Sequence, residues 1–319
     1  MLTPATDCWF LTGPTAAGKT LVSLELAQMI NAEIISMDSM AIYREMDIAT
    51  AKPSRRHRSV ATHHLIDIVD PDKDYSLSTY YDAALQLIEE IRDRGKQVLF
   101  VGGTPLYLKA LLRGIFEGPP ADWEFRREVE EEVRTVGVAA LHQRLELVDP
   151  LTAARLHPGD VRRIIRALEV RRATGQPISH LQLQFDEGRS ASQCKVFVIQ
   201  WTREDLLKRI DRRVDHMFEE GLIDEVRRLR NKYSHLSRTA SQAVGYRETL
   251  DYLDQNLDLQ TTIELVKIRT RRFAKRQRTW FRGLSECRTL LRTEDDHPDE
   301  IAQWIVKMAE GGQVAHPLE

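Results

Sequence analysis

Short apolar runs alternate with amphipathic segments in the first third of the chain. Four of these runs are bounded by glycine, proline or aspartate: Cys8–Thr12, Ile34–Met37, His64–Val69 and Val98–Val101. Such runs are typical of strands that are buried in a parallel sheet. Apolar residues at helical spacing predict helices over Lys19–Ile30 and Ser78–Arg94, and the second helix stops at Gly95. The repetition of strand, turn and helix predicts an α/β fold with a parallel sheet flanked by helices.

The pattern changes after the segment Glu117–Pro120. Residues 122–192 contain only helical segments rich in Arg and Glu, which predict a helical insertion. The chain then returns to the sheet with a strand over Lys195–Ile199, followed by helices over Glu204–Glu220 and Leu257–Arg282 and a strand over Cys287–Leu291. We therefore expect a first part of the α/β core at residues 1–117, a helical insertion domain at 118–192, and the rest of the core with long basic helices at 193–319.

The composition is that of an ordinary globular protein. Of the 319 residues, 42% are hydrophobic and 29% are charged, which is enough apolar material for a core domain and an accessory one. No uncharged apolar stretch approaches the ~18 residues of a membrane span, and the N-terminus lacks the pattern of a signal peptide. The three cysteines lie far apart without a CxxC pair, which favours a reducing compartment. We expect a cytoplasmic, soluble monomer with no membrane association.

Charge is unevenly distributed along the chain. The net charge is −2, which argues against a general nucleic-acid binder. The segment Lys267–Arg282, however, contains eight Lys or Arg residues and no acid. That pattern favours a polyanion-binding face over a solvated face with salt bridges. Arg162, Arg163 and Arg166 form a second basic group, but Glu169 is close by, and a salt-bridged helix surface explains this group equally well.

A phosphate-binding motif follows the first predicted strand. The pattern G-x-x-x-x-G-K-[ST] is matched in full by Gly13, Pro14, Thr15, Ala16, Ala17, Gly18, Lys19 and Thr20. Its position between a strand and an amphipathic helix lets backbone N–H groups and the helix N-terminus converge on phosphate oxygens. The Lys19 ammonium supplies a point charge, and the Thr20 hydroxyl can reach a Mg²⁺ ion. The motif predicts a phosphate site, but it does not by itself predict ATP.

The second carboxylate that ATPases and GTPases use beside this motif is missing from the best candidate strand. Val98–Val101 is followed by Gly102, Gly103 and Thr104, without an acid. Asp38 ends a different strand, and the ends of parallel strands face the ligand crevice. Asp38 is therefore either a site residue or the cap of a helix or turn. The Thr104 hydroxyl can equally donate to a phosphate oxygen or cap the next helix.

Further motifs accompany the phosphate-binding segment in a fixed order. They are Asp38-Ser39, Tyr43–Pro53, His64–Asp67, Gly102–Tyr107, Arg166–Val170, Val244–Arg247 and Ala274–Trp280. Together with Gly13–Thr20 this set resembles the tRNA dimethylallyltransferases (tRNA isopentenyltransferases), and the likeness runs to about Arg282. The resemblance implies a P-loop NTPase-like core with an all-helical insertion. It also implies transfer of a dimethylallyl group from dimethylallyl pyrophosphate to N6 of adenine 37, beside the tRNA anticodon, with release of pyrophosphate.

The resemblance also implies roles for individual residues. Asp38 would orient the adenine amine and accept its proton, Thr104 would hydrogen-bond the oxygen that leaves carbon, and Arg213 would neutralise pyrophosphate. The target base must be flipped out, which needs a grip on nearby phosphates and an aromatic filler. The residues implied in contact with the tRNA anticodon stem-loop are Asp38, Ser39, Met40, Ala41, Arg126, Arg162, Arg163, Ile164, Ile165, Arg166, Gln242, Ala243, Val244, Gly245, Tyr246, Arg247, Lys275, Arg276, Gln277, Arg278, Thr279, Trp280, Phe281 and Arg282.

Two positions depart from the family pattern. Ala41 stands where many members carry glutamine, and Ala49 stands where glycine is usual. The Cys/His zinc finger of many eukaryotic relatives is absent, so a bacterial-type enzyme fits better. Arg126 and Arg213 can equally be arginines on the surface of helices.

Two other classes of protein share some of these features. A small-molecule or nucleoside kinase has a P-loop core and a helical lid, but the sequence shows no evident purine-stacking residues. A non-catalytic nucleic-acid-binding module with a vestigial P-loop is the third possibility. The intact Gly18-Lys19-Thr20 argues against that module.

Overall fold

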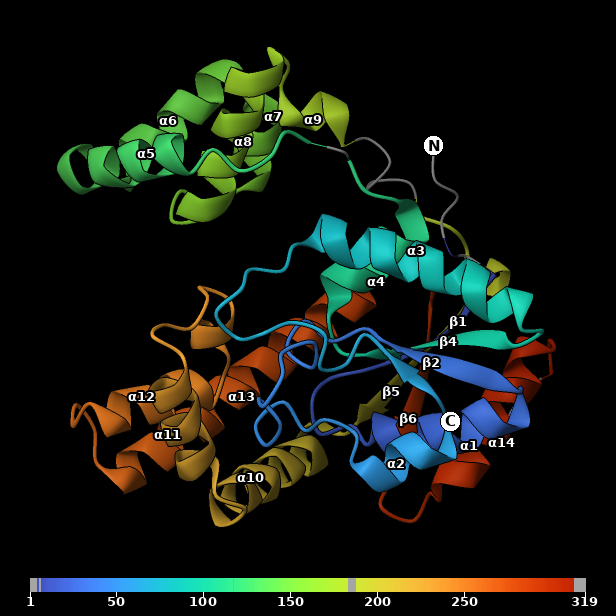
Figure 1. Cartoon of the computed structure of the whole chain (residues 1–319). Coiled ribbons are helices and arrows are strands. Elements are labelled where there is room, and N and C mark those ends of the chain that lie inside the picture. The colour runs from blue at the N-terminus through green and yellow to red at the C-terminus, as the bar shows by residue number, and fades with distance from the viewer. Residues whose placement is uncertain (1–4, 6, 117, 183–187, 313–319) are drawn as a thin grey trace. The chain divides into compact units, whose positions relative to one another are not determined.

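The computed structural model describes residues 5, 7–116, 118–182 and 188–312 (Figure 1). The chain divides into two compact units. A helical unit is formed by Arg113–Glu187, and a larger unit combines Thr3–Leu112 with Gly188–Glu319. Among the described residues, no helix is both long and apolar enough to cross a membrane.

The larger unit is built on one six-stranded sheet with the order β3-β2-β4-β1-β5-β6. The strands are β1 (Trp9–Thr12), β2 (Ala32–Ser36), β3 (His63–His64), β4 (Gln97–Gly102), β5 (Lys195–Trp201) and β6 (Cys287–Arg292). Every neighbouring pair is parallel, so the predicted α/β fold with a parallel sheet is confirmed. Because β1 lies between β4 and β5, the segment that follows β1 emerges at the middle of the sheet edge.

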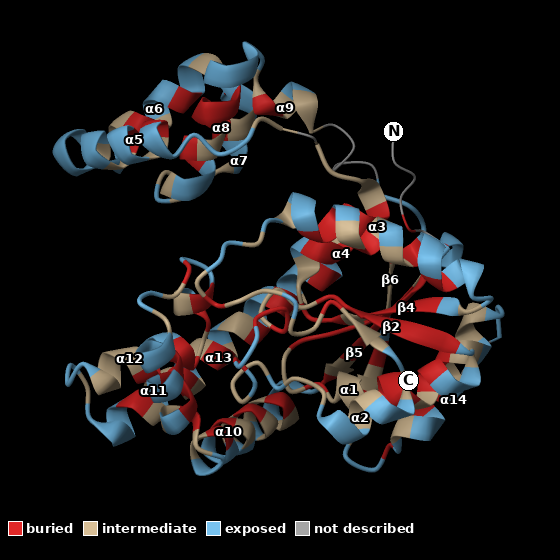
Figure 2. Cartoon of the chain, in the orientation of Figure 1, coloured by how far each residue is buried: buried red, intermediate tan, exposed pale blue. Residues whose placement is uncertain are grey.

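Helices cover both faces of the sheet. α3 and α4 lie over one face, and α1 and α14 lie over the other (Figure 1). Buried residues concentrate where these helices meet the strands (Figure 2). The helices of this unit are α1 (Lys19–Met29), α2 (Arg55–Val60), α3 (Leu77–Asp93), α4 (Pro105–Arg113), α10 (Arg203–Glu219), α11 (Leu222–Lys232), α12 (Tyr246–Leu253), α13 (Leu259–Arg282) and α14 (Pro298–Ala309), with short 3-10 turns η2 (Ala191–Gln193) and η3 (Ala240–Gln242).

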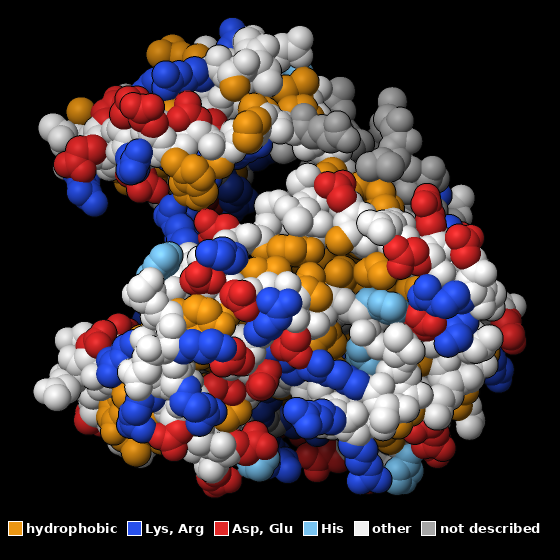
Figure 3. Space-filling model, in the orientation of Figure 1, with side chains coloured by type: hydrophobic (Ala, Val, Ile, Leu, Met, Phe, Trp, Pro, Cys, Tyr) orange, Lys and Arg blue, Asp and Glu red, His pale blue; other side chains and the backbone are white. Residues whose placement is uncertain are grey.

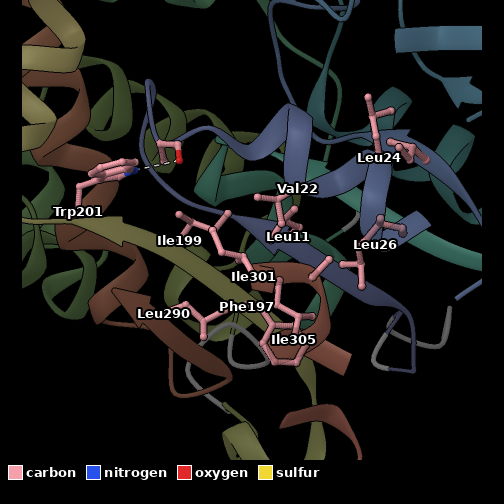
Figure 4. Close-up of a cluster of buried hydrophobic side chains, with 14 of the residues drawn as sticks. Leu11, Val22, Leu24, Leu26, Phe197, Ile199, Trp201, Leu290, Ile301 and Ile305 are labelled. Carbon is pink, nitrogen blue, oxygen red and sulfur yellow. Dashed lines mark hydrogen bonds between the residues drawn. The ribbon is translucent and has the colours of Figure 1, made fainter. Parts of the chain in front are cut away.

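A hydrophobic core fixes the position of β1 and of the loop after it (Figure 4). Leu11 of β1 and Phe197 of β5 are fully buried and belong to one cluster with Ile305 of α14. Burying each such side chain stabilises the fold by roughly 1.5–3 kcal/mol. At the edge of this cluster the Trp201 indole N–H donates to the Ala17 carbonyl at 3.0 Å. The core therefore holds the loop after β1 in a defined place.

The strand predicted over His64–Val69 is wrong beyond its first residue. β3 ends at His64, because Leu65 and Asp67 both have a φ of 57°. This left-handed backbone conformation breaks a strand. The turn is stabilised by the Asp67 carboxylate, which accepts from the Lys52 ammonium at 2.6 Å and the Arg58 guanidinium at 2.7 Å.

The helical unit has its own core. Its helices are α5 (Trp123–Val136), α6 (Val138–Val148), α7 (Pro150–Arg155), α8 (Val161–Thr174) and α9 (Ile178–Leu181). Phe125, Leu145 and Ile164 are among the buried residues of the cluster between these helices. No strand occurs within the described part of this unit, which agrees with the helical pattern of its sequence.

The chain segments at the carboxyl ends of the paired strands β2 and β4 approach each other closely. The Met37 N–H donates to the Val101 carbonyl at 2.7 Å, and the Thr104 N–H donates to the Met37 carbonyl at 3.2 Å. A Cβ atom at Gly102 would overlap the Met37 carbonyl. Only glycine therefore allows this approach, which brings Asp38 and Thr104 to the same edge of the sheet.

We predict that Gly102→Ala destabilises the protein, because the added methyl group must displace the Met37 backbone. Overpacking of this kind costs typically ~1–3 kcal/mol in the free energy of unfolding. Gly283→Ala is the matched control, since its Cβ would meet nothing closer than 3.4 Å. Urea denaturation compares the two variants. Equal unfolding midpoints for both would contradict the close approach of β2 and β4.

Candidate active site

A cavity of about 810 Å³ opens at the carboxyl ends of the central strands. It is lined by the loop Thr15–Thr20, by the ends of β2 and β4, and by residues of α10 and α13. Gly18 caps the start of α1 with a φ of 84°, which favours glycine. The N–H groups in the first turn of α1 have no partners within the helix, and the helix dipole adds positive potential there. The predicted motif thus lies at a helix N-terminus inside a cavity.

Lys19 carries the charge at the centre of this loop. Its Nζ donates to the carbonyls of Gly13 at 3.0 Å and Pro14 at 2.9 Å. Burial lowers the pKa of Lys19 to about 8, while nearby Asp38 opposes this shift and Arg213 adds to it. An anion bound beside the ammonium would favour its charged form. Lys19 is therefore a cation whose charge depends on what the cavity holds.

We predict that the contribution of Lys19 to pyrophosphate binding declines above about pH 8. Below that pH the free protein already carries the charged ammonium; above it, binding must take up a proton, so affinity falls up to about tenfold per pH unit. Lys19→Met removes the charge and is the reference that cancels the titration of pyrophosphate itself. Near pH 7 the wild type should bind roughly tenfold or more tightly than this variant. If calorimetry finds the same ratio of wild-type to Lys19→Met affinity at pH 7 and at pH 9.5, the lowered pKa of Lys19 is contradicted.

Three side chains from distant parts of the chain hold the backbone of the loop. The Gln277 Oε1 accepts from the Thr15 N–H at 2.9 Å, and the Arg209 Nε donates to the Ala16 carbonyl at 2.9 Å. The Trp201 bond to Ala17 is the third, and the Arg209 guanidinium lies 4.2 Å from the centre of the Trp201 ring. Sequence reasoning missed the roles of Trp201 and Arg209, since neither belongs to a local phosphate-binding pattern.

Arg213 lines the cavity with Lys19 and Asp38. Burial lowers the pKa of Arg213, and the Asp38 charge opposes this effect. The Arg213 Nε is buried and has no hydrogen-bond partner among the described residues. A buried N–H group of a cation without such a partner is costly unless an anion satisfies it. The position of Arg213 therefore suits an anionic ligand and does not match an arginine on a helix surface.

Asp38 and Thr104 lie on the facing ends of β2 and β4. The Asp38 Oδ1 accepts from the Met40 N–H at 2.8 Å, while its Oδ2 has no hydrogen-bond partner among the described residues. The Thr104 Oγ1 accepts from the Ser39 N–H at 3.1 Å, which leaves the hydroxyl hydrogen free to donate. Both side chains line the cavity. Asp38 thus caps a turn with one oxygen and presents the other to a ligand.

The far wall of the cavity is anchored by a buried carboxylate. Glu225 accepts from the Tyr246 hydroxyl at 2.5 Å and from the backbone N–H groups of Asp47 and Ile48. Burial raises the pKa of Glu225, and the bond from Tyr246 opposes the shift. The predicted contact residues that line this cavity are Asp38, Ser39, Met40, Ala41, Gln242, Ala243, Val244, Tyr246, Arg276 and Gln277. Tyr246 is fully buried and forms part of this wall through its hydrogen bond to Glu225, whereas Arg247 is exposed.

The basic helix α13 has two different halves. In the first half, Lys267 pairs with Asp215 at 2.8 Å, Arg269 with Glu248, and Arg271 with Asp211 at 2.5 Å, so these charges have acidic partners on other helices. The expectation of an unpartnered run was wrong for this half. In the second half, four cations form no ion pair with any described residue: Lys275, Arg276, Arg278 and Arg282.

Two side chains of the second half of α13 do not face outward. Phe281 is 1% exposed and packs in the core, so the expected aromatic contact with tRNA is wrong for it. Gln277 is 3% exposed and bonds to the phosphate-binding loop. Trp280 is 42% exposed and Thr279 lies beside it on the outer face. Of the two aromatic residues on this helix that were predicted to contact tRNA, Trp280 is therefore the one whose side chain is exposed.

In the helical unit, the buried Glu169 bonds two of the predicted arginines, Arg126 and Arg166. Its carboxylate accepts from Arg126 at 2.8 and 2.9 Å and also from Arg166. Ile164 and Ile165 are buried in the helical core, so direct contact of their side chains with tRNA was a wrong expectation. Among the predicted contact residues of α8, Arg162 and Arg163 are exposed, and Arg163 pairs with Asp160. This face is thus partly neutralised, as the alternative of a salt-bridged surface required.

The residues around the loop fit a magnesium ion that is held mainly by its ligand. The Thr20 hydroxyl lines the cavity and makes no hydrogen bond to a described residue. No group of three or more His, Cys, Asp or Glu side chains within the described ranges could hold a metal by itself. Mg²⁺ commonly takes one or two protein oxygens and completes its shell with phosphate oxygens and water. A single hydroxyl beside a phosphate cradle is compatible with that mode.

The sheet topology, the motif between β1 and α1, and the cavity define a protein of the P-loop NTPase-like class. The sequence model of the family described as IPP transferase matches residues 41–284. The tRNA dimethylallyltransferase of Rhodopirellula baltica is 47% identical over 312 residues, which cover 95% of this chain and 93% of that protein. The chain therefore belongs to the IPP transferase family.

Solved structures agree with this assignment. The full-length tRNA isopentenylpyrophosphate transferase of Bacillus halodurans matches with a TM-score of 0.67 and 39% identity, covering 95% of this chain and 97% of that one. A eukaryotic dimethylallyltransferase acting on tRNA matches with a TM-score of 0.76 and 26% identity, covering 97% of this chain and 81% of that one. The predicted family and the predicted class of enzyme, a transferase, are confirmed. The kinase and the non-catalytic module find no support among these matches.

Proposed function

We propose that this enzyme transfers a dimethylallyl group from dimethylallyl pyrophosphate to N6 of adenine 37 in tRNA, beside the anticodon. The observation that carries the proposal is the position of Asp38 and Thr104 in one cavity with the phosphate-binding loop. The end of β4 carries no carboxylate that would position a water for hydrolysis. The site is thus suited to a carbon–oxygen bond cleavage in which pyrophosphate leaves.

The chemistry assigns each residue a separate task. The adenine amine attacks the allylic carbon, the carbon–oxygen bond breaks, and its electrons leave with pyrophosphate. The Asp38 carboxylate, through its unpaired Oδ2, orients the amine and takes the proton that the new nitrogen–carbon bond makes acidic. The Thr104 hydroxyl donates to the oxygen that leaves carbon, where negative charge develops.

The leaving pyrophosphate is held by positive charge. Lys19, Arg213 and the first turn of α1 would surround its oxygens. Mg²⁺, when bound, would neutralise part of the pyrophosphate charge, and the Thr20 hydroxyl is the protein group that would hold it. We place tRNA along the second half of α13, with Trp280 as the aromatic that fills the place the flipped base leaves. The reaction would occur in the cytoplasm, and the enzyme would act as a monomer.

We predict that Asp38→Asn lowers the single-turnover rate by about 100-fold or more, because general-base contributions are typically 10²–10⁴-fold. The amide keeps the bond from the Met40 N–H, so the fold and pyrophosphate affinity should be unchanged. Asp74→Asn is the matched control, since Asp74 is exposed and does not line the cavity. Rapid-quench kinetics with tRNA and dimethylallyl pyrophosphate measures the rate. A rate near that of the wild type would reduce Asp38 to a turn cap.

We predict that reversing Lys275 and Arg278 to Glu cripples tRNA binding and leaves pyrophosphate binding intact. Each phosphate contact that is lost should also reduce the slope of log affinity against log salt by about 0.7–0.9. The control reverses two exposed cations elsewhere, Arg228 of α11 and Lys307 of α14. Filter binding over a salt series gives both quantities. If the slope of the Lys275/Arg278 variant equals that of the wild type, tRNA binds another surface.

A further inference from the structure

One side chain joins α13 to the phosphate cradle. Gln277 is 3% exposed and lies on the inner face of the helix. Its Oε1 accepts from the Thr15 N–H at 2.9 Å, and its Nε2 donates to the Gly103 carbonyl at 2.5 Å. A Cβ at Gly103 would meet this Nε2 at 2.6 Å, so the amide is closely packed. Both ends of the amide are thus bonded to the backbone of the site.

The two bonded groups belong to the two functional segments of the cavity. Thr15 starts the part of the loop that lines the cavity, and Gly103 immediately precedes Thr104. Among the described residues, Gln277 makes the only hydrogen bonds between α13 and either segment. The strands before the two segments are paired, and Thr12 bonds to the Gly102 carbonyl at 2.7 Å. Beyond these contacts, the Gln277 amide ties the loop and the Thr104 segment to α13. Loss of a buried amide leaves both backbone groups unsatisfied, which is costly.

The same turn of α13 carries the cations that face outward. Lys275 lies two residues before Gln277 and is exposed; Arg278 follows Gln277 directly and is partly exposed. Neither forms an ion pair with a described residue. A hydrogen bond of 2.5–2.9 Å weakens steeply when its partners shift or tilt. A helix turn held by RNA phosphates on one face would therefore hold the amide on the other face in its bonded position. Ordering of the loop before the anion arrives would lower the cost of binding that anion.

We propose that Gln277 is a positioning residue that couples RNA binding on α13 to pyrophosphate binding in the cradle, and not a direct contact to RNA. The coupling part rests on the proposed tRNA substrate; the positioning part does not. Coupling between binding sites is reciprocal, so each ligand should raise the affinity for the other. The expected gain in pyrophosphate affinity on adding RNA is about fivefold or more.

The test uses Gln277→Met, which keeps the length of the side chain and removes both hydrogen bonds. Gln260→Met is the matched control, since Gln260 lies on the same helix, is exposed and is remote from the cavity. Calorimetry measures the affinity for inorganic pyrophosphate with Mg²⁺, with and without an anticodon stem-loop RNA. Filter binding measures the affinity for the RNA alone. Circular dichroism checks that both variants are folded.

Gln277→Met should bind pyrophosphate about fivefold more weakly than the wild type, as expected for the loss of about 1 kcal/mol of hydrogen bonding. The affinity for RNA alone should change less than twofold. The factor by which RNA raises pyrophosphate affinity should fall toward one. Weakened RNA binding with normal pyrophosphate binding would make Gln277 an RNA contact and overturn the proposal. Unchanged binding of both ligands would also overturn it.

A measurement on the wild type keeps the proposal testable if the variant does not fold. Hydrogen exchange should slow in the segment 14–20 when the stem-loop RNA binds, because the Thr15 N–H is held more firmly. Unchanged exchange there, with RNA demonstrably bound, would overturn the coupling. If RNA does not bind the wild type at all, the proposed tRNA substrate is wrong. The pyrophosphate affinities of the wild type and Gln277→Met then still decide whether Gln277 positions the phosphate-binding loop.

Discussion

The partly buried ammonium of Lys19 is the constraint on which the site depends. The ammonium donates hydrogen bonds to two loop carbonyls, and burial lowers its pKa to about 8. Arg213 adds a second cation, whose buried Nε has no hydrogen-bond partner among the described residues. Positive charge of this kind is unfavourable in a low-dielectric site until an anion enters. The face shown in the space-filling view carries basic, acidic and apolar side chains intermixed (Figure 3). We therefore assign recognition of the anion to the cations inside the cavity.

The parallel sheet turns this anion site into a reaction site. Because β1 is central and the backbone after β2 packs against Gly102 of β4, the cradle, Asp38 and Thr104 meet at one edge. A carboxylate and a hydroxyl at that edge, without a second acid at the end of β4, suit the departure of pyrophosphate from carbon better than attack by water. The matching of residues 41–284 to the IPP transferase family agrees with this chemistry.

Local patterns predicted what depends on local interactions. Five of the six strands, the loop and the helix at its end follow from short apolar runs and a contiguous motif, and the structure has them close to where they were expected. The end of β3 at His64 was missed, because it depends on left-handed backbone at Leu65 and on ion pairs with Lys52 and Arg58.

Partners that are distant in sequence explain the other differences. Thr15 and Gln277 are 262 residues apart, so nothing near either residue indicates their hydrogen bond. The acids that neutralise Lys267 and Arg271 lie on α10 and are absent from the basic segment itself.

The direct measurement of the central claim is mass spectrometry of nucleosides from unmodified tRNA incubated with the protein, Mg²⁺ and dimethylallyl pyrophosphate. The account predicts an adenosine heavier by one C₅H₈ unit, at the position beside the anticodon. Unmodified adenosine there, with intact protein and tRNA, would contradict it.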